Sequence, residues 1–459
     1  MRLLLLLRRR AHHRSAASIS VVEQTGAPAH WNARSAFTVF FLGTTAGVQM
    51  SDMGLQAVSL SAIQAEYGMG DAAAGALQGL AGVLAGSALA MPLARFADRY
   101  SRKRVLLWLI VASTAMMLLS ALAPNFALFF VGRSAAGITE FAMVPLVYSM
   151  IPDLAPERHR VPANLVFAAL MASGASGGFY FSGTLLAAAT WLPLELDAWR
   201  GAFMLLGLAG VPLLALGLFV TDPPRHGVTP GSMRRGSLWR FLYLRRHALA
   251  YFAGAAGCMI VAVQAVNHLI SLALERRFEA GRGDIGHAMG VIVLISALGC
   301  LPVAGVLDRV LVPRLGTAAR PTIMFACTLL AIPALIMLDH VNRVDLAFVV
   351  VGVTLFTTST ANALVPTMLQ DLTSPAVRAS TFALWSFVVS VFGAAGPLLA
   401  GALSEGVLNG QLVRAIALAA IPALSIATLC ALRLALLTGG RKNVAAHRAT
   451  RACRQQQVK

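Results

Sequence analysis

The chain has 459 residues, of which 58% are hydrophobic and only 12% are charged. Soluble domains carry about 25% charged residues, so this sequence has too little polar surface to cover a water-soluble globule. The formal net charge of +18 would suggest nucleic acid as a partner if the basic residues formed one face interleaved with aromatic residues. They lie instead in short loops and the two tails, which argues against a nucleic-acid partner and for an integral membrane protein.

We expect twelve membrane-spanning helices, because the apolar stretches are close to the roughly 20 residues that cross the hydrocarbon core. In chain order they cover residues 36–59, 72–94, 105–122, 126–150, 162–189, 199–221, 249–274, 285–307, 321–338, 345–369, 379–403 and 412–436. The ninth is among the shortest, and the glycine-rich fifth is the one expected to break. The predicted fold class is an all-α membrane protein.

Residues 1–35 are predicted to be a basic tail. An apolar run of leucines between arginines at the start imitates a signal peptide, but it is too short for one. Lys and Arg concentrate in this tail, in the loop after span two and in the central loop, whereas the loop after span seven departs from this bias. The positive-inside rule then predicts that both termini are cytoplasmic, in the plasma membrane or, in a bacterium, the inner membrane.

A long basic connection, residues 222–248, separates six spans in residues 36–221 from six in residues 249–436, and a second basic tail follows at 437–459. Two weak repeats occupy equivalent places in the halves. Ala-Arg-Phe-Ala-Asp-Arg, ending at Asp98-Arg99, is echoed by Ala-Gly-Val-Leu-Asp-Arg, ending at Asp308-Arg309. Pro-Glu-Arg-His-Arg from Pro156 is echoed by Pro-Ala-Val-Arg from Pro375. These features predict two pseudo-symmetric six-helix bundles, as in a duplicated secondary transporter.

Residues 92–103, which read Pro-Leu-Ala-Arg-Phe-Ala-Asp-Arg-Tyr-Ser-Arg-Lys, resemble the loop motif of the major facilitator superfamily. Residues 133–140, Arg-Ser-Ala-Ala-Gly-Ile-Thr-Glu, resemble a span-four motif of its spinster-like branch. The resemblance implies that the loop motif is a cytoplasmic gate between the halves. The residues assigned to this gate are Asp98, Arg99, Arg102 and Lys103, with Asp308 and Arg309 as a degenerate counterpart.

The same resemblance implies a substrate class. Spinster-like members are associated with lysophospholipids and sphingoid lipids, so a small organic or lipid-like amphiphile is the expected substrate. An organic-anion:proton symporter, in which Arg133 binds a carboxylate, is an alternative within the superfamily. The sequence departs from the branch at Met53, where an arginine usually follows the acid. That departure leaves open a non-transporting membrane sensor with the same fold.

Three ionisable residues lie deep in the spans of the first half: Asp52, Arg133 and Glu140. Such groups are costly in a bilayer and are usually functional. Asp52 and Arg133 are at similar depth, and Glu140 is two helical turns beyond Arg133 on the same face, about 10 Å deeper. We interpret the three as a proton-coupled charge relay in which Asp52 and Arg133 pair. The alternative is a static ion pair that fixes helix packing.

Weaker candidates for a substrate cavity are Tyr148, Tyr180, Gln264, Asn267, His268 and Asn362. His268 could carry protons or simply form an interhelical hydrogen bond. The cysteines lack metal-binding spacing, and the sequence contains no P-loop and no hydrolase motif. We therefore expect no metal, no cofactor and no enzymatic activity. The expected partners are the substrate, protons and the bilayer, and the chain is expected to be a monomer.

Overall fold

The computed structural model describes residues 31–85, 100–193, 195–220, 222, 235–373 and 378–456, and every regular element in these ranges is helical. The predicted gate residues Asp98 and Arg99, and nearly all of the predicted amino-terminal tail, lie outside the described residues. The structure thus shows the predicted all-helical class over the described ranges.

The helices of the first half are α2 (Ala33–Tyr67), α3 (Asp71–Ala76), the π-helical η1 (Leu77–Ala85), α5 (Arg102–Ala121), α6 (Phe126–Leu154), α7 (Glu157–Tyr180), α8 (Ser182–Ala189), α9 (Ala198–Leu208) and α10 (Gly210–Gly217). Those of the second half are α11 (Arg235–Leu244), α12 (Arg246–Phe278), α13 (Arg282–Leu315), the short 3₁₀ turn η2 (Gly316–Ala318), α14 (Ala319–Leu338), α15 (Val344–Leu372), α16 (Arg378–Gly406) and α17 (Leu412–Gln456).

Local sequence explains where several of these helices begin and end. Asn32 and Asn125 cap α2 and α6, since their side-chain oxygens accept hydrogen bonds from backbone N–H groups three residues later, at 2.8 and 2.9 Å. Gly68 ends α2 in the left-handed conformation, with φ of 59°. The starts of α2 and α6 and the end of α2 are therefore fixed by local sequence.

Over its described residues, each predicted span falls on one helix or on two consecutive helices; residues 86–94 of the second span lie outside the described ranges. The fifth is broken as expected, with a bend of 53° between α7 and α8. Among the described residues, eight helices are long and apolar enough to cross a membrane, or nine when this bent pair counts as one span. α2 is not among the eight, and its interior contains polar residues such as Gln49 and Asp52. The count of twelve remains a prediction that agrees with the helix order.

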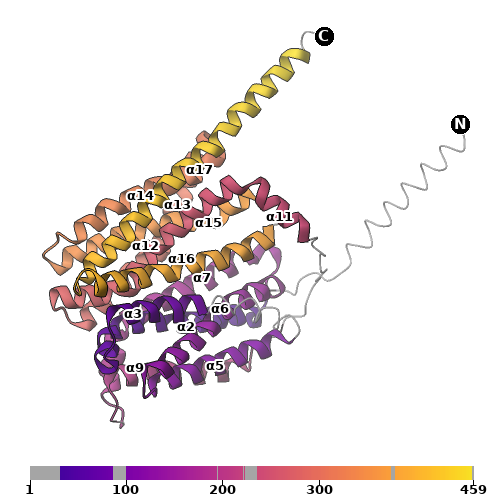
Figure 1. Cartoon of the computed structure of the whole chain (residues 1–459). Helices are drawn as coiled ribbons and strands as arrows, with labels where there is room; N and C mark the ends of the chain where they lie inside the picture. The colour runs from indigo at the N-terminus through magenta and orange to yellow at the C-terminus, as the bar shows by residue number, and fades with distance from the viewer. Residues whose placement is uncertain are drawn as a thin grey trace, which may run out of the picture.

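Two predicted connections are more helical than the sequence suggested. The central connection contains α11, and α12 begins at Arg246, inside the predicted loop. The predicted carboxyl-terminal tail continues the last span as one helix, α17, which protrudes from the bundle in Figure 1. Neither segment has an apolar run long enough to predict a membrane span. Hydropathy therefore predicted the first as a loop and the second as a tail.

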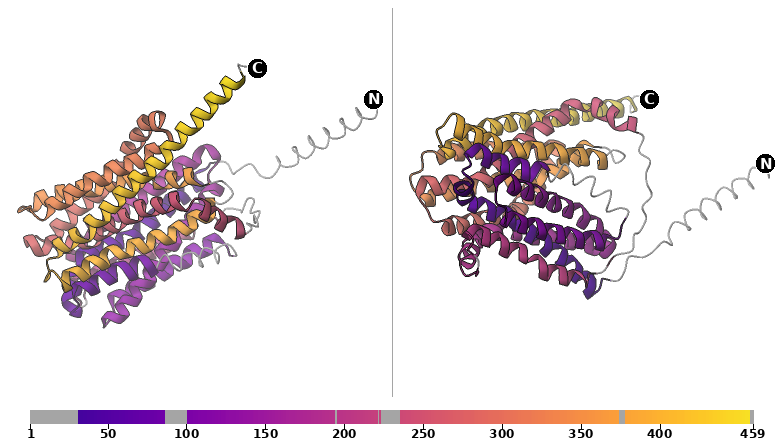
Figure 2. Two further views of the ribbon diagram at one scale, coloured as in Figure 1. Left: turned by 45° about the horizontal axis from the view of Figure 1, so that its top comes forward. Right: turned by 60° about the horizontal axis from the view of Figure 1, so that its bottom comes forward.

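The helices of the two halves lie on opposite sides of the molecule, as the colours in Figures 1 and 2 show. They meet along two seams: α16 packs against α3 and η1, and α13 packs against α7 and α8. In the second seam, Ser176 Oγ donates a hydrogen bond to the carbonyl of Gly290, at 2.7 Å. The halves therefore share a continuous interface rather than a single hinge contact.

Within the first half, α2 and α7 approach closely at small residues. A Cβ atom added at Gly178 would lie only 1.9 Å from the carbonyl oxygen of Ser51. Ser51 Oγ also donates a hydrogen bond to the carbonyl of Gly174, at 2.7 Å. Small residues that permit backbone contact are characteristic of helix pairs in membranes. This packing holds α2, and with it Asp52, against the rest of the bundle.

Candidate functional site

Asp52 of α2 and Arg133 of α6 form a buried ion pair. Arg133 Nη1 lies 2.6 Å from Asp52 Oδ2. Only 1% of Asp52 and 3% of Arg133 is exposed, so the pair has almost no access to solvent. The two helices place these residues at the same depth, and the structure brings them together.

Glu140 lies on the same helix as Arg133 and belongs to the same cluster. It is 4% exposed, and it interacts electrostatically with both Asp52 and Arg133. The sequence predicted Glu140 about 10 Å deeper in the membrane than Arg133. Glu140 nevertheless interacts with the Asp52–Arg133 pair. Asp52 of the neighbouring helix α2 interacts with both Arg133 and Glu140 of α6. The three residues therefore act as one buried charge cluster.

The surroundings of the cluster offer few competing partners. The Arg133 guanidinium lies 5.5 Å from the ring centroid of Phe203 and 3.8 Å from the sulfur of Met117. The charged neighbours of the Asp52 carboxylate are Arg133 and Glu140. Asp52 and Gln49 line a small cavity of about 20 Å³, large enough for a single water molecule.

This arrangement carries one more negative than positive group. Two carboxylates facing one guanidinium leave one negative charge unmatched when all three are ionised. An unmatched charge in a low-dielectric interior is expensive, and binding one proton removes it. The cluster therefore contains one carboxylate more than a single ion pair requires.

One end of the bundle is closed by polar contacts between the halves. Asp71, at the start of α3, accepts hydrogen bonds from Gln64 at 3.0 Å, from Arg276 at 2.9 Å and from Ser404 at 2.5 Å. Arg276 also donates to Gln64, at 2.7 Å. Asp71 is 6% exposed. It thus joins α2 and α3 of the first half to α12 and α16 of the second.

The environment of Asp71, which precedes the predicted second span, also fixes its charge. Burial raises the pKa of the carboxyl, but hydrogen bonds from Arg276, Ser404 and Gln64 outweigh burial, so the pKa lies below its ordinary value. A lowered pKa means that this link is present above the ordinary aspartate range and is lost only as the pH falls through the lowered pKa. At neutral pH the contact is fully charged.

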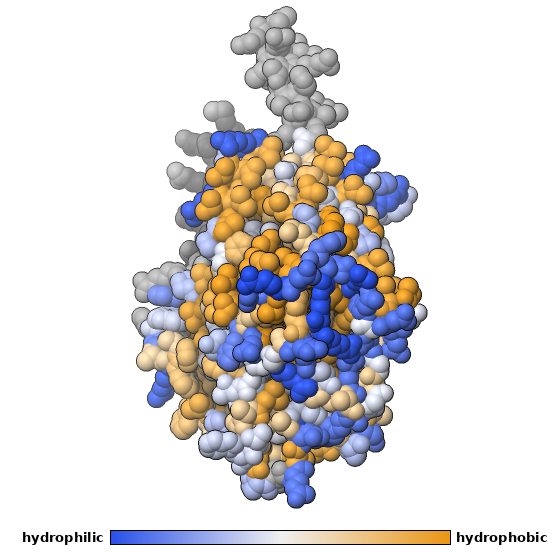
Figure 3. All heavy atoms as spheres, turned by 90° about the vertical axis from the view of Figure 1, so that its left-hand side faces the viewer, coloured by the Kyte–Doolittle hydropathy of each residue, from blue (hydrophilic) through white to orange (hydrophobic). Residues whose placement is uncertain are grey.

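Two further contacts cross between the halves at this end. Glu405 of α16 accepts a hydrogen bond from the backbone N–H of Ala72, at 2.8 Å. Glu275 of α12 accepts one from Ser61 of α2, at 2.7 Å. A Cβ atom added at Gly401 would lie 2.2 Å from the carbonyl oxygen of Asp71, so the helices approach closely. Figure 3 shows hydrophilic residues gathered across the middle of this end. We refer to Ser61, Gln64, Asp71, Ala72, Glu275, Arg276, Ser404 and Glu405 as the end clamp.

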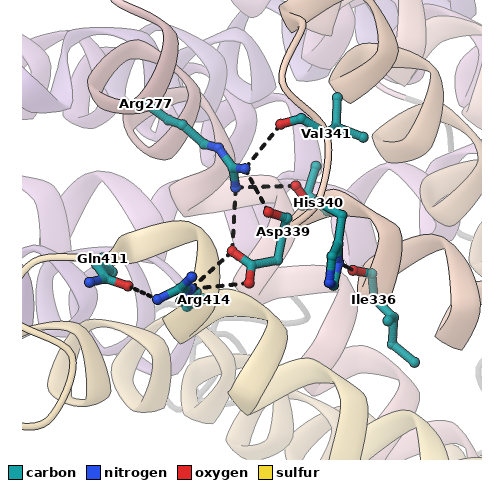
Figure 4. A network of polar contacts seen from close by, with 8 residues as sticks. Arg277, Ile336, Asp339, His340, Val341, Gln411 and Arg414 are labelled. Atoms are coloured by element: carbon teal, nitrogen blue, oxygen red, sulfur yellow. Dashed lines mark hydrogen bonds and ion pairs between the residues drawn. The ribbon is translucent and has the colours of Figure 1, made fainter.

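Beside the end clamp lies a second network, which stays within the second half. Asp339 binds Arg277 at 3.4 Å and Arg414 at 3.0 Å, as Figure 4 shows. Arg277 also donates to the carbonyls of Asp339 and Val341, at 2.6 and 3.0 Å. This network ties α12, the α14–α15 loop and α17 together, and all of its hydrogen bonds and ion pairs among the described residues stay within the second half.

The described part of the predicted gate motif contacts the first half. Arg102 forms an ion pair with Asp153 at the end of α6. Lys103 Nζ donates a hydrogen bond to the carbonyl of Leu218, at 2.6 Å. Ser101 Oγ donates to Asp222, at 2.5 Å. The expected pairing of Asp98 with the second half falls on residues outside the described ranges.

The second half contains an equivalent of this arrangement. Arg320 of α14 binds Asp308 of α13 at 2.8 Å and also pairs with Asp371 at the end of α15. Arg320 follows Arg102 by the same number of residues as Asp371 follows Asp153. Arg309 is exposed and makes no hydrogen bond or ion pair with the described residues. The internal repeat is thus expressed as two matching networks, each within one half.

Three of the weaker cavity candidates come from α12. His268 is 3% exposed, and its Nε2 lies 3.4 Å from Gln264 Nε2 on the same helix. The expected interhelical hydrogen bond is therefore replaced by a contact along α12. Asn267, next to His268, is half-buried. Among the described residues, none of the three forms a hydrogen bond or ion pair with the charge cluster.

The remaining cavity candidates lie at separate places. Asn362 is exposed on α15. Tyr148 is 45% exposed and packs edge-on against Phe167, with ring centroids 5.2 Å apart. Tyr180 packs against His287 at 4.7 Å, beside an apolar cavity of about 900 Å³ between α13 and α15. The structure does not gather these predicted residues into one site.

Sequence reasoning missed the end clamp. Asp71 lies in the short connection before the second predicted span, and Arg276 lies in the loop after span seven that departs from the charge bias. The exception has a structural reason, because Arg276 is held by Asp71 across the interface between the halves. The sequence signal for this contact was an acidic residue, Asp71, directly before span two and a base, Arg276, directly after span seven.

The comparisons with known proteins agree with the fold. The sequence profile of the Major Facilitator Superfamily matches residues 41–364. An MFS-type efflux pump of Mycolicibacterium smegmatis (strain ATCC 700084 / mc(2)155) is 25% identical over 402 residues, covering 84% of this chain and 88% of the pump.

Solved structures give the same result. A bacterial homologue of the human lysosomal transporter Spinster, inward-facing and unoccupied, aligns with a TM-score of 0.72 at 19% identity and covers 89% of this chain and 96% of its own. Its occupied form aligns at 0.70 and 18% identity, covering 91% and 97%. A D-xylose–proton symporter aligns at 0.66 and 15% identity, covering 85% and 97%. With a profile match over most of its length and this shared fold, the chain belongs to the Major Facilitator Superfamily.

Proposed function

We propose that this chain is a proton-coupled secondary transporter that works by alternating access and moves a small organic or lysolipid-like amphiphile. The observation that carries the proposal is the buried cluster of Asp52, Arg133 and Glu140. A static ion pair needs one acid and one base. The second buried acid fits a cluster that takes up and releases a proton as the bundle opens to one side or the other.

The contacts of Arg133 favour an amphiphile over an organic anion. An anion symporter would need the guanidinium free to bind a carboxylate of the substrate. Arg133 is already held by Asp52 at 2.6 Å and is 3% exposed. The spinster-like motif in the sequence and the likeness to a spinster homologue support the same choice. The name of the efflux pump similar to this chain favours export as the direction.

A side cavity also supports an amphiphilic substrate. The cavity of about 900 Å³ between α13 and α15 is lined mainly by apolar residues. Ile295 and Val349 in its wall are 57% and 62% exposed, so it opens on the side of the bundle. Asp284, His287 and Asp345 lie among its lining residues, toward one end. An opening of this shape suits a molecule with a long apolar part and a polar head.

The charge bias supports the orientation. The basic starts of α5 (Arg102, Lys103, Arg104) and α12 (Arg246) lie at the end of the bundle that carries the beginning of α2 and the end of α17 (Figure 1). We infer that this end faces the cytoplasm and that the end clamp faces the outside of the plasma membrane or bacterial inner membrane. The clamped conformation is then inward-facing, like the spinster homologue that it resembles.

The test is a transport screen with a proton readout. Purified protein is reconstituted in liposomes that enclose a pH-sensitive dye, and lysophospholipids, sphingoid bases, organic acids and cationic drugs are added one class at a time. The proposal predicts that an amphiphile moves protons through the protein and not through empty liposomes. Proton movement with organic acids alone would favour the anion symporter. Substrate flux without proton movement would refute the coupling.

A further inference from the structure

α11 presents large apolar side chains without a packing partner to match them. Trp239 and Tyr243 are one helical turn apart and are 72% and 68% exposed, and Leu244 is 71% exposed. The helix lies at the end of the bundle from which α17 protrudes, at an angle to α12 (Figure 1). Tryptophan and tyrosine on one helical face are characteristic of the membrane–water interface, where a ring has one apolar and one wet side.

The same segment is strongly basic. Arg240, Arg245 and Arg246 lie in or directly after α11, and residues 235–250 contain no Asp or Glu. The guanidinium of Arg246 lies 4.5 Å from the ring centroid of Tyr243, so a base and an interfacial aromatic residue sit together. Arginines beside aromatic side chains attract the anionic headgroups of the cytoplasmic leaflet. Charge and exposure thus favour the same environment.

A cavity of about 540 Å³ lies beside α11. Arg245 and His247 contribute its basic wall, and Leu434 and Leu437 of α17 contribute apolar wall. Arg245 is half-buried, and its side chain makes no hydrogen bond or ion pair with the residues that the structure describes. The combination of a cation and an apolar wall suits an amphiphilic anion.

One acid, Asp371, lines the same cavity. Asp371 pairs with Arg320, which also holds Asp308, and it forms no ion pair with Arg245. The guanidinium of Arg245 is therefore left for an anionic ligand, and Arg320 offsets part of the negative charge of the two carboxylates. Thr317 adds a hydroxyl group that can donate a hydrogen bond to a phosphate oxygen, whereas the Thr438 hydroxyl already donates to the carbonyl of Leu434, at 2.8 Å.

We propose that α11 lies in the cytoplasmic membrane interface and that the adjoining cavity binds the phosphate group of an anionic phospholipid from that leaflet. Arg245 bonds the phosphate, and an acyl chain lies along Leu434 and Leu437. The proposal uses the orientation inferred above but not the transported substrate. The lipid is a bound regulator or stabiliser at the end of the second half, remote from Asp52 and Glu140.

The test is lipid binding by the purified full-length chain in a neutral detergent. Native mass spectrometry and thermal unfolding are measured during titration with phosphatidylglycerol, with phosphatidylcholine and with inorganic phosphate. The variants are Arg245→Gln and, as a matched control, Arg314→Gln, an exposed arginine outside the cavity. We expect phosphatidylglycerol to bind and to raise the unfolding temperature of the native and control proteins. Arg245→Gln should bind it about tenfold more weakly, the loss expected for one charge-assisted hydrogen bond.

Several outcomes would overturn the proposal. Equal binding of phosphatidylglycerol by Arg245→Gln and by the native chain would remove the arginine from the site. Equal stabilisation by phosphatidylcholine would mean that no anionic group is recognised, and equal stabilisation by inorganic phosphate would mean that no lipid is needed. A Trp239→Phe variant tests α11 itself, because brominated phosphatidylglycerol should quench less fluorescence when Trp239 is absent. Unchanged quenching would place α11 outside the interface. None of these readouts depends on transport, so their failure is distinct from failure of the transporter assignment.

Discussion

Replacing Asp71 by asparagine should open the end clamp. The substitution keeps the shape of the side chain and one acceptor oxygen, but it removes the charge that Arg276, Ser404 and Gln64 bind. A hydrogen bond to a charged group contributes about 1.5–3 kcal/mol. Because 38% of the Arg276 side chain is exposed, solvent screens part of its contribution. We therefore expect a net loss of about 2 kcal/mol, which shifts the equilibrium between clamped and open forms by roughly 30-fold.

The shift can be measured as a distance between the halves. Spin labels at Pro124 and Val407, both exposed at the clamped end, report on the first and second halves respectively in a cysteine-free background. Pulsed electron spin resonance should show one distance in the parent protein. The Asp71→Asn variant should add a population at longer distance.

The matched control is Asp339→Asn. Asp339 also pairs with arginines at this end, but Arg277 and Arg414 both belong to the second half. Its loss should lower the unfolding temperature without adding the longer distance. An unchanged distance distribution in Asp71→Asn, or the same change in Asp339→Asn, would refute the idea that Asp71 holds the halves together.

Two further predictions concern packing and the repeated network. Gly178→Ala should cost about 1–3 kcal/mol of stability, because the new Cβ atom would clash with the carbonyl oxygen of Ser51. Gly305→Ala is the control and should be neutral, because the space around Gly305 is open. Equal unfolding temperatures of the two variants would contradict the packing argument. Arg320→Gln should lower the free energy of unfolding by about 1–2 kcal/mol, since it leaves the carboxylates of Asp308 and Asp371 without a partner. Arg309→Gln, at an exposed arginine, is the control in the same thermal unfolding assay. A loss no larger than that of the control would show that the network does not stabilise the second half.

Hydropathy predicted the fold well because a span must be apolar and of fixed length. The spans coincide with helices, and the break in the fifth falls at Phe181, after its glycines. Hydropathy did not predict the helices that are not apolar along their whole length. α11 and the end of α17 are helical and basic, and neither contains an apolar run long enough to be predicted as a span.

The charge cluster was partly predictable, and the end clamp was not. Asp52, Arg133 and Glu140 stood out because charged residues are rare inside spans. Their common depth predicted the pair, but the position of Glu140 depends on the direction of long side chains, which helix rise does not give. Asp71, Ser404 and Arg276 are separated by long stretches of sequence, and polar residues at span ends are common. Only the arrangement of the halves brings them together.

The most direct test of the central claim is transport driven by a pH gradient in proteoliposomes. With one proton per substrate, a gradient of one pH unit supports about tenfold accumulation of a transported amphiphile. Asp52→Asn and Glu140→Gln should each abolish this accumulation, while exchange of labelled for unlabelled substrate at equal pH continues, because exchange needs alternating access but no net proton movement. Undiminished pH-driven accumulation in both variants would contradict the account.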